Sequence, residues 1–418
     1  MSHRARKTTW LASLGAGLEY YDFIVYGMMV VYLNTLFFSS SELWINQMKA
    51  FGVFAVGYIA RPFGGILFGM IGETFGRKST FLAVMMLMAS ATFAIGLLPT
   101  REHIGETAAV LLVVLRVLQG LSFGAELPGA ITVVHEHADK NRRALYSGFV
   151  ISSVSLGSLL ASLILFLITK NLHEAQILQW GWRLPFLFGG LLAVANYLIR
   201  KEMLETPEFL HLDSERSAKK SIKEPLLQLL KHHRGNVLRG IGMTVFFASL
   251  VISFLYLPTY LSTWFPYSSS TVYLAMTYGM AWSALTLPFF GYLADRWGAM
   301  TLFLIASLGF ILLAFPLFHL LSFGNNATLI IFMMLYQTAI SASIVSYFPL
   351  LSSSFPTQVR FTGIALCYNV VYALMGMAPI LITFLIHRTH ANAAIWFLIS
   401  CALNSAASGF FAKKTHSH

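Results

Sequence analysis

The sequence predicts an all-α membrane protein with twelve transmembrane helices in two six-helix, pseudo-symmetric bundles. Its composition is the first reason: 57% of the residues are hydrophobic and 11% are charged, whereas soluble domains carry about 25% charged residues. The second reason is a series of apolar runs of about 20 residues, the length at which a helix crosses a bilayer. The third is a loop motif that occurs once in each half of the chain. Together these features exclude a soluble globule.

The apolar runs recur along the whole chain. We expect membrane-spanning helices near residues 11–38, 47–71, 79–98, 107–134, 143–169, 182–199, 236–262, 271–292, 300–322, 327–351, 361–386 and 391–411. The longest polar stretch, residues 200–235, lies between the sixth and seventh runs and is expected to be a cytoplasmic linker. It would join an N-terminal bundle (1–199) to a C-terminal bundle (236–418). Four leucines at 226, 227, 229 and 230 could form a short amphipathic helix there, although a solvated connector is the favoured interpretation.

A repeated loop supports the division into two halves. Residues 69–78 read Gly-Met-Ile-Gly-Glu-Thr-Phe-Gly-Arg-Lys, and residues 291–300 read Gly-Tyr-Leu-Ala-Asp-Arg-Trp-Gly-Ala-Met. Each loop has a glycine, an acid four residues later and a glycine three residues after that. A second pair, residues 141–148 and 356–363, puts an arginine at the start of the next predicted span with a glycine soon after. Repeats at this spacing indicate two related helical bundles.

The net charge of +11 is distributed as a topology signal. With the N-terminus in the cytoplasm, the outer loops hold only four basic residues: Arg101, Lys170, Arg183 and Arg388. The inner loops hold most of the others: Arg4, Arg6, Lys7, Arg77, Lys78, Lys140, Arg142, Arg143, Arg296, Arg360, Lys413, Lys414 and those in 200–239. This positive-inside asymmetry predicts that both termini are cytoplasmic, in a multi-pass protein of the bacterial inner membrane. A nucleic-acid partner is not expected; lipid is.

The sequence offers few signs of metal or enzyme chemistry. Its two cysteines, Cys367 and Cys401, lie inside apolar runs and are expected to be buried thiols rather than a disulfide. We see no metal-ligand spacing of cysteine, histidine and carboxylate residues, and no Ser/His/Asp arrangement. We therefore expect no enzymatic activity and no bound cofactor.

Five charged residues fall at membrane depth, all in the N-terminal half: Glu19, Asp22, Arg61, Arg116 and Glu126. A charge there is costly and is a functional hypothesis by default. Glu19 and Asp22 share one helix face, and we predict that Asp22 forms an ion pair with Arg116, because arginine can hold a carboxylate with two parallel bonds. Glu19, Glu126 and Arg61 would form a second cluster.

Three acids against two arginines leave one acid that burial pushes toward its neutral form. Such an acid can bind and release a proton. The alternative interpretation is a fixed ion-pair network that joins the first, second and fourth spans.

Polar and aromatic residues at membrane depth are candidates for binding a small solute near the midplane. They are Tyr26, Gln119, Tyr256, Trp282, Gln337, Tyr368, Asn369 and Tyr372. The alternative is ordinary packing, since tyrosine and tryptophan are common in membrane helices and at their interfaces. Asn369 and Gln337 are the stronger candidates because a buried amide without a partner is costly.

The repeated loops predict a conformational latch. Its residues would be Gly69, Glu73, Gly76, Arg77, Arg142, Arg143, Asp295, Arg296 and Arg360. We expect Glu73 and Asp295 to cap the helices that follow them. We also expect these acids to pair across the cytoplasmic face with Arg142 or Arg143, and with Arg360. Such pairs would keep the cytoplasmic side closed and break when it opens.

Longer motifs run through the chain in a definite order. They are Glu19-Tyr-Tyr-Asp22-Phe-Ile-Val-Tyr26-Gly27, Arg61-Pro62-Phe-Gly64, Leu115-Arg116-Val-Leu-Gln119-Gly120, Gly124-Ala-Glu126, Trp180-Gly-Trp-Arg183-Leu-Pro185-Phe, Glu205-Thr-Pro207-Glu-Phe209, Leu257-Pro-Thr-Tyr260-Leu, Phe355-Pro-Thr-Gln-Val-Arg360-Phe-Thr362-Gly363 and Tyr368-Asn369. With the Gly-x-x-x-acid-x-x-Gly-Arg-Lys loop at 69–78, they resemble the major facilitator superfamily, and more specifically its metabolite:proton symporter family. The resemblance covers nearly the whole chain.

This resemblance implies a secondary active transporter that works by alternating access. The expected activity is proton-coupled import of a small polar metabolite, an organic acid or a zwitterion, since members of the family carry proline and betaine, α-ketoglutarate, citrate or shikimate. The coupling ion would be H⁺, with Na⁺ as the alternative, and the protein a monomer. The competing hypotheses are a proton-coupled exporter of a metabolite, siderophore or drug, and a membrane sensor that binds its ligand without moving it.

The chain departs from the family pattern at several positions. Glu73 and Thr74 stand where the first loop usually has Asp and Arg, and Ala125 replaces a glycine before Glu126. The second loop has Ala299 and Met300 in place of an Arg-Lys pair. Because the C-terminal tail is short, we expect no coiled coil of the kind that osmosensing members carry, which disfavours an osmoregulatory betaine carrier.

Overall fold

The structure is a computed structural model that describes residues 3–38, 42–75, 77–124, 127–128, 131, 139–200, 223–356, 359–389 and 392–415. Within these ranges, only the backbone is described for residues 3–16, 19, 43, 69–81, 140, 199–200, 223–225 and 411–415. The described residues are helical almost throughout and contain no strand. This confirms the predicted fold class.

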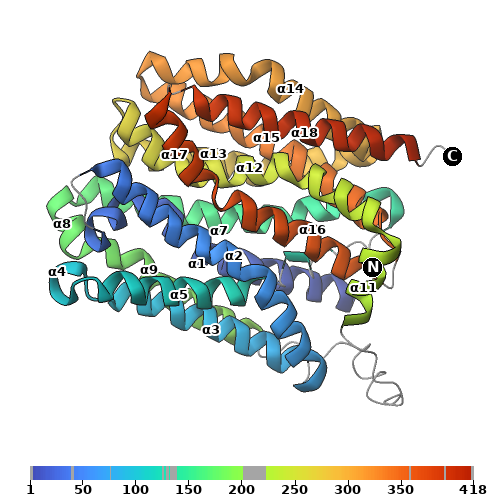
Figure 1. The fold of residues 1–418 in the computed structure, drawn as a ribbon, viewed down its shortest axis with the longest axis horizontal. Helices are drawn as coiled ribbons and strands as arrows, with labels where there is room; N and C mark the ends of the chain where they lie inside the picture. The colour runs from blue at the N-terminus through green and yellow to red at the C-terminus, as the bar shows by residue number, and fades with distance from the viewer. Residues whose placement is uncertain are drawn as a thin grey trace.

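Twelve helical segments of the described chain run side by side, six from each half (Figure 1). The first six are α1 (His3–Phe37), α2 (Leu43–Phe75), α3 (Arg77–Leu97), α5 (Thr107–Phe123), α7 (Arg143–Asn171) and α9 (Leu184–Arg200). The second six are α12 (Arg234–Trp264), α13 (Ser269–Trp297), α14 (Ala299–His319), α15 (Asn326–Ser353), α16 (Arg360–Met375) continued by α17 (Ala378–Arg388), and α18 (Ala393–Thr415). Seven of the described segments satisfy both the length and the hydropathy expected of a membrane span.

Short elements lie at the two ends of the bundle. At one end are α4 (Arg101–Ile104), α8 (Glu174–Gln179) and the 3₁₀ turns Gly181–Arg183 and Leu320–Phe323. At the other end are the 3₁₀ turn Lys140–Arg142, α11 (Lys223–His232) and both chain termini (Figure 1). We call these the α8 end and the α11 end. Residues 201–222 of the predicted linker lie outside the described residues, while α11 is a short amphipathic helix that buries Leu229 and exposes Leu227 and Leu230.

Local sequence explains several helix boundaries. Ser268 and Asn325 cap α13 and α15 with side-chain oxygens that accept from Thr271 N and Thr328 N, the usual role of such residues. Between α13 and α14, Gly298 has φ of 91°, a conformation that side chains disfavour. The second glycine of the repeated loop therefore permits the tight turn.

The predicted span at 361–386 is two helices in line rather than one. Helix α16 ends at Met375 and α17 begins at Ala378, with Pro379 in its first turn. A proline has no N–H to donate and its ring collides with the carbonyl group four residues earlier, so the helix is interrupted here. The predicted membrane span is confirmed, and the structure adds a break within it.

The two halves meet along α7 and α13. The Ser152 hydroxyl donates to Ala284 O at 2.6 Å, and the Thr277 hydroxyl donates to Ser162 at 3.1 Å. Gly291 allows the backbones to approach, since a Cβ atom there would lie 2.6 Å from Ala144 O. Small and hydroxylated residues are typical of helix pairs that pack closely in membranes.

A second contact between the halves runs along α2, α16 and α17. The Tyr58 ring on α2 stacks on Tyr372 of α16, with centroids 5.9 Å apart. Near the α8 end, Trp44 on α2 stacks on His387 of α17 at 4.4 Å. Each half therefore touches the other at both ends of the bundle.

Candidate functional site

Arg116 lies on α5 in the interior of the first half and is fully buried. Its Nη1 donates to the side-chain oxygen of Gln119 at 2.8 Å. Longer contacts join Nη1 to Phe23 O at 3.4 Å and Nη2 to Phe54 O at 3.5 Å. The Tyr26 ring centroid lies 4.4 Å from the guanidinium carbon. Arg116 is thus held by an amide, two backbone carbonyls and an aromatic face, and it links α5 to α1 and α2.

Asp22 on α1 is also buried, with 3% of its surface exposed, but it does not pair with Arg116. No ion pair joins the Asp22 carboxylate to Arg116 within 4.0 Å, whereas Arg101 and Glu106 form one at the α8 end. The predicted Asp22–Arg116 ion pair is therefore wrong in this conformation. In the described chain the Asp22 Oδ1 atom has no hydrogen-bond partner; it faces α9 at Gly189, where a Cβ atom would collide with it.

The geometry of α1 and the position of Gln119 explain why the pair is absent. The Phe23 side chain faces Arg116, with its ring centroid 4.8 Å from the guanidinium carbon. The Asp22 side chain, about 100° away around the helix, faces α9 at Gly189. Gln119 occupies the space between them: it accepts from Arg116, and its Nε2 donates to the Thr92 hydroxyl at 2.8 Å. The same Nε2 atom lies 3.5 Å from Asp22 O. Gln119 is therefore the neutral link between the arginine and the acid-bearing helix.

Arg61 on α2 is 1% exposed and enclosed by aromatic rings of both halves. The predicted cluster of Arg61 with Glu19 and Glu126 stays a prediction, because Glu126 lies outside the described residues and only the backbone of Glu19 is described.

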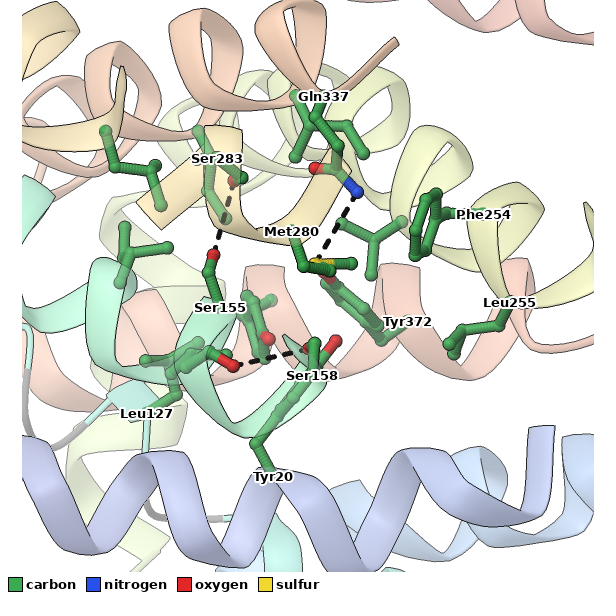
Figure 2. Close-up of a pocket in the computed structure, with 17 residues that line it drawn as sticks. Tyr20, Leu127, Ser155, Ser158, Phe254, Leu255, Met280, Ser283, Gln337 and Tyr372 are labelled. Carbon is green, nitrogen blue, oxygen red and sulfur yellow. Dashed lines mark hydrogen bonds between the residues drawn. The ribbon is translucent and has the colours of Figure 1, made fainter. Parts of the chain in front are cut away.

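An internal cavity of about 50 Å³ lies between the halves. A water molecule needs about 10–15 Å³ of such space, so the cavity has room for a few waters and must enlarge to hold a metabolite. Figure 2 shows Tyr20, Ser155, Ser158, Gln337 and Tyr372 around it. Its wall comes from α1, α7, α12, α13, α15 and α16, together with Leu127.

The eight residues predicted to bind substrate fall into three groups by location. Gln337, Tyr368 and Tyr372 line the cavity, whereas Tyr26 and Gln119 contact Arg116. The remaining three lie outside the lining. Asn369 donates to Gly124 O at 2.7 Å across the two halves, and Tyr256 accepts from the Thr383 hydroxyl at 3.2 Å. Trp282 is 37% exposed and donates to Thr338 at 2.9 Å.

Sequence reasoning missed the hydroxyl-bearing wall of the cavity. Ser155 and Ser158 are three residues apart on α7 and share a face, and Ser155 lies 3.3 Å from Ser283 on α13. Ser283 continues to Ser341 on α15 at 3.2 Å. The spacing of serines in the run 147–162 was the available signal, but serine also occurs wherever helices pack closely.

The latch differs from its prediction at Asp295. Its two carboxylate oxygens accept from Ala144 N at 3.0 Å and Leu145 N at 2.9 Å, at the N-terminus of α7 in the other half. The expectation that Asp295 caps the helix after it was wrong, since Gly298 precedes α14 without a side-chain cap. A carboxylate is stabilised by the free N–H groups and positive end of a helix, and α7 offers these.

The other latch residues make local contacts or lie outside the described part. Arg296 lies 3.5 Å from the Tyr292 hydroxyl, and Arg360 donates to Ser352 O at 3.1 Å. Among the described residues, neither Arg142 nor Arg143 forms an ion pair with Asp295. Gly76 is not described, and of Gly69, Glu73 and Arg77 only the backbone is, so their roles stay predictions.

We expect Asp295→Ala to weaken the closed α11 end. Loss of a charged cap costs about 0.5–2 kcal/mol, which shifts a two-state equilibrium by about 2- to 30-fold. The measurement is maleimide labelling of Leu287→Cys, a residue of the cavity wall, in a background with Cys367 and Cys401 replaced by serine. Labelling should become several-fold faster in Asp295→Ala. Asp139→Asn, an exposed acid near the same helix start, serves as the control, and equal rates in both variants would contradict the assignment.

Comparison with known proteins agrees with this architecture. The family model described as Major Facilitator Superfamily matches residues 12–379. A putative proline/betaine transporter of Staphylococcus aureus is 32% identical over 92% of this chain and 83% of its own. The shikimate transporter of Escherichia coli K12 is 31% identical over 96% and 93%. The glycine betaine/proline/ectoine/pipecolic acid transporter of Dickeya dadantii is 28% identical over 99% and 84%.

Solved structures share the fold at low sequence identity. The xylose transporter of E. coli, in a partially occluded inward-open conformation, has a TM-score of 0.78 at 18% identity and covers 97% of both chains. A structure of a D-xylose–proton symporter has a TM-score of 0.77 at 19% identity, covering 97% of this chain and 96% of the other. From the matched model and the curated relatives together, this chain belongs to the major facilitator superfamily and is a multi-pass membrane transporter.

Proposed function

We propose that this transporter imports a small organic acid or zwitterion together with a proton. The observation that carries the proposal is the environment of Asp22. It is a buried carboxyl group with an oxygen that lacks a partner among the described residues, and no described cation within ion-pair distance. A buried, unpaired carboxylate is costly, so this conformation favours the neutral acid. A conformation that admits water or brings a cation near would favour release of the proton.

The surrounding contacts support a role in coupling. Arg116 is bound to Gln119 and lies beside backbone oxygens, contacts that are weaker than a bidentate pair with a carboxylate. A small rotation of α1 relative to α5 would let Asp22 replace them. The proton would then leave as the ion pair forms, which links protonation to the conformation of the first half.

The two helix seams suggest how access alternates. Asp295 and α7 connect the halves at the α11 end, and Trp44 and His387 connect them at the α8 end. If the halves rock about the central cavity, one connection opens while the other stays closed.

We propose that the protein lies in the inner membrane with its α11 end in the cytoplasm, because the basic residues of that end indicate this orientation. We also propose that it acts as a monomer with H⁺ as its coupling ion.

The direct test is substrate-dependent proton uptake into proteoliposomes that contain a pH-sensitive dye. The panel would contain di- and tricarboxylates, shikimate, proline, betaine and amino acids, each added outside. Acidification of the lumen by one solute class would support symport and give the direction of proton movement. Alkalinisation during substrate entry, or accumulation driven by Na⁺ without a proton signal, would contradict it.

A further inference from the structure

The guanidinium of Arg61 is the feature that the coupling proposal does not use. It lies on α2 among five aromatic rings. The distances from its central carbon to the ring centroids are 5.5 Å for Phe23, 5.3 Å for Tyr58, 4.7 Å for Phe123, 5.2 Å for Tyr368 and 5.0 Å for Tyr372. Within the described chain, its Nε and Nη2 atoms have no hydrogen-bond partner. A fully buried guanidinium prefers ring faces to hydrocarbon, but among the described residues Nε and Nη2 still lack the acceptor that an N–H group needs.

Two of these rings also face the cavity. Tyr368 and Tyr372 are one turn apart on α16 with ring centroids 4.4 Å apart, and both line the cavity. They therefore lie between the guanidinium of Arg61 and the space between the halves. Because Arg61 belongs to the first half and the tyrosines to the second, relative movement of the halves changes how much of the guanidinium faces the cavity.

The rest of the described cavity lining is neutral. Ser155, Ser158 and Ser283 present hydroxyl groups (Figure 2), and Gln337 Nε2 contacts a methionine sulfur at 3.7 Å, a weak acceptor. No aspartate or glutamate is among the lining residues that the structure describes. The described part of this wall can exchange hydrogen bonds with hydroxyl groups, and its described residues include no counter-charge for an ammonium group.

We propose that Arg61 binds the carboxylate of the substrate once Tyr368 and Tyr372 move aside, and that the Ser155–Ser158–Gln337 wall binds hydroxyl groups at the substrate's other end. The substrate is then a hydroxylated monocarboxylate. Among the described residues near the cavity, Arg61 is a guanidinium with unpaired N–H groups, which fits one carboxylate, and the described hydroxyl groups fit hydroxyls rather than a quaternary ammonium. The inference rests on the proposed import of an organic acid or zwitterion and chooses between those two classes.

Equilibrium binding to the purified full-length protein in detergent tests this assignment. The probes are shikimate, quinate, gluconate and glycerate, each compared with its neutral methyl ester. Three further solutes represent the alternative classes: glycine betaine is a zwitterion, citrate is a tricarboxylate, and cyclohexanecarboxylate is an acid without hydroxyl groups. We expect saturable binding for at least one hydroxylated monocarboxylate, with its ester and the three other solutes at least about 10-fold weaker. Failure of all four acids to bind, or tighter binding of betaine, would overturn the substrate class.

Variants of Arg61 separate binding from structure. Arg61→Gln should weaken binding of the acid by about 10- to 100-fold and leave the ester's affinity unchanged, while Arg61→Lys should recover part of the loss. Because the glutamine removes a buried charge without an acceptor, the melting temperature of the ligand-free protein should not fall. Lys170→Gln is the control, since it removes an exposed cation that lies over the Phe166 ring. It should change neither the binding affinity nor the melting temperature.

The opposite pattern would show a structural role. If Arg61→Gln lowers the melting temperature and binds the acid with wild-type affinity, Arg61 only joins the rings. This assay involves no proton gradient, so its failure leaves proton coupling through Asp22 intact. Conversely, if a variant of Asp22 showed that this residue does not couple transport to protons, the binding result for Arg61 would still be valid.

Discussion

Substituting Asp22 by asparagine should abolish uphill accumulation of the substrate while leaving exchange across the membrane. Each pH unit is worth about 1.4 kcal/mol per proton, a factor of ten in accumulation, so two units can sustain about a 100-fold gradient in a one-proton symporter. In Asp22→Asn the ratio should fall to one. The asparagine has nearly the same shape as the protonated acid and keeps the contact with Gly189, so the protein should fold.

Two assays in the same proteoliposomes measure the two activities. Counterflow, in which labelled substrate enters against an equal internal concentration, reports the movement of the loaded carrier and needs no proton gradient. Accumulation under an imposed pH difference reports coupling. Glu106→Gln, which removes the acid of the exposed pair at the α8 end, should retain both activities. Wild-type accumulation in Asp22→Asn would exclude Asp22 as the coupling acid.

The fold could be predicted because its signal is distributed over the whole chain. Apolar runs and the matching loops at 69–78 and 291–300 depend on composition and period, not on the position of any one side chain. The exception at 375–378 is instructive. Pro379 was visible in the sequence, but several other prolines, including Pro258 and Pro288, lie within unbroken helices, since neighbouring membrane helices can accommodate them.

The sequence predicted which charged residues are buried at the site, but it did not predict which of them contact one another. Burial of Asp22, Arg61 and Arg116 follows from their place inside apolar runs, and the structure confirms it. Which acid meets which arginine depends on rotations of a few tens of degrees about each helix axis, and a sequence does not fix those rotations. The hydrogen bonds of Gln119 illustrate this, because a neutral amide occupies the place that charge complementarity assigns to Asp22.

The prediction for Asp295 in the latch was right about the type of partner and wrong about its identity. Its carboxylate was expected at a helix N-terminus, and it does accept hydrogen bonds from one. The nearest N-terminus in sequence is α14, but the one in contact is α7 in the other half. Local motif logic identifies the type of partner, whereas the tertiary arrangement of the halves selects it.

The largest effect on stability is expected from enlarging Gly64, where α2 crosses α5. A Cβ atom at Gly64 would overlap the backbone oxygen of Leu121, and one at Gly124 on the other side would overlap Arg61 O. Backbone atoms cannot rotate away as side chains can, so the two helices must separate. Overpacking usually costs about 1–3 kcal/mol, and we expect Gly64→Val to reach or exceed the upper value, with loss of most folded protein.

Gly52 provides a matched control in the same helix. A Cβ atom there meets nothing within 4 Å, and replacing a helical glycine with alanine usually stabilises by up to about 1 kcal/mol. Melting temperatures of purified protein in detergent should therefore fall for Gly64→Ala and further for Gly64→Val, but rise or stay constant for Gly52→Ala. If Gly64→Ala matched Gly52→Ala, the close crossing of α2 and α5 would be wrong. Because Arg61 lies between Gly57 and Gly64 on this same face, the crossing also fixes the arginine among its rings, so a stability loss at Gly64 should be accompanied by weaker carboxylate binding.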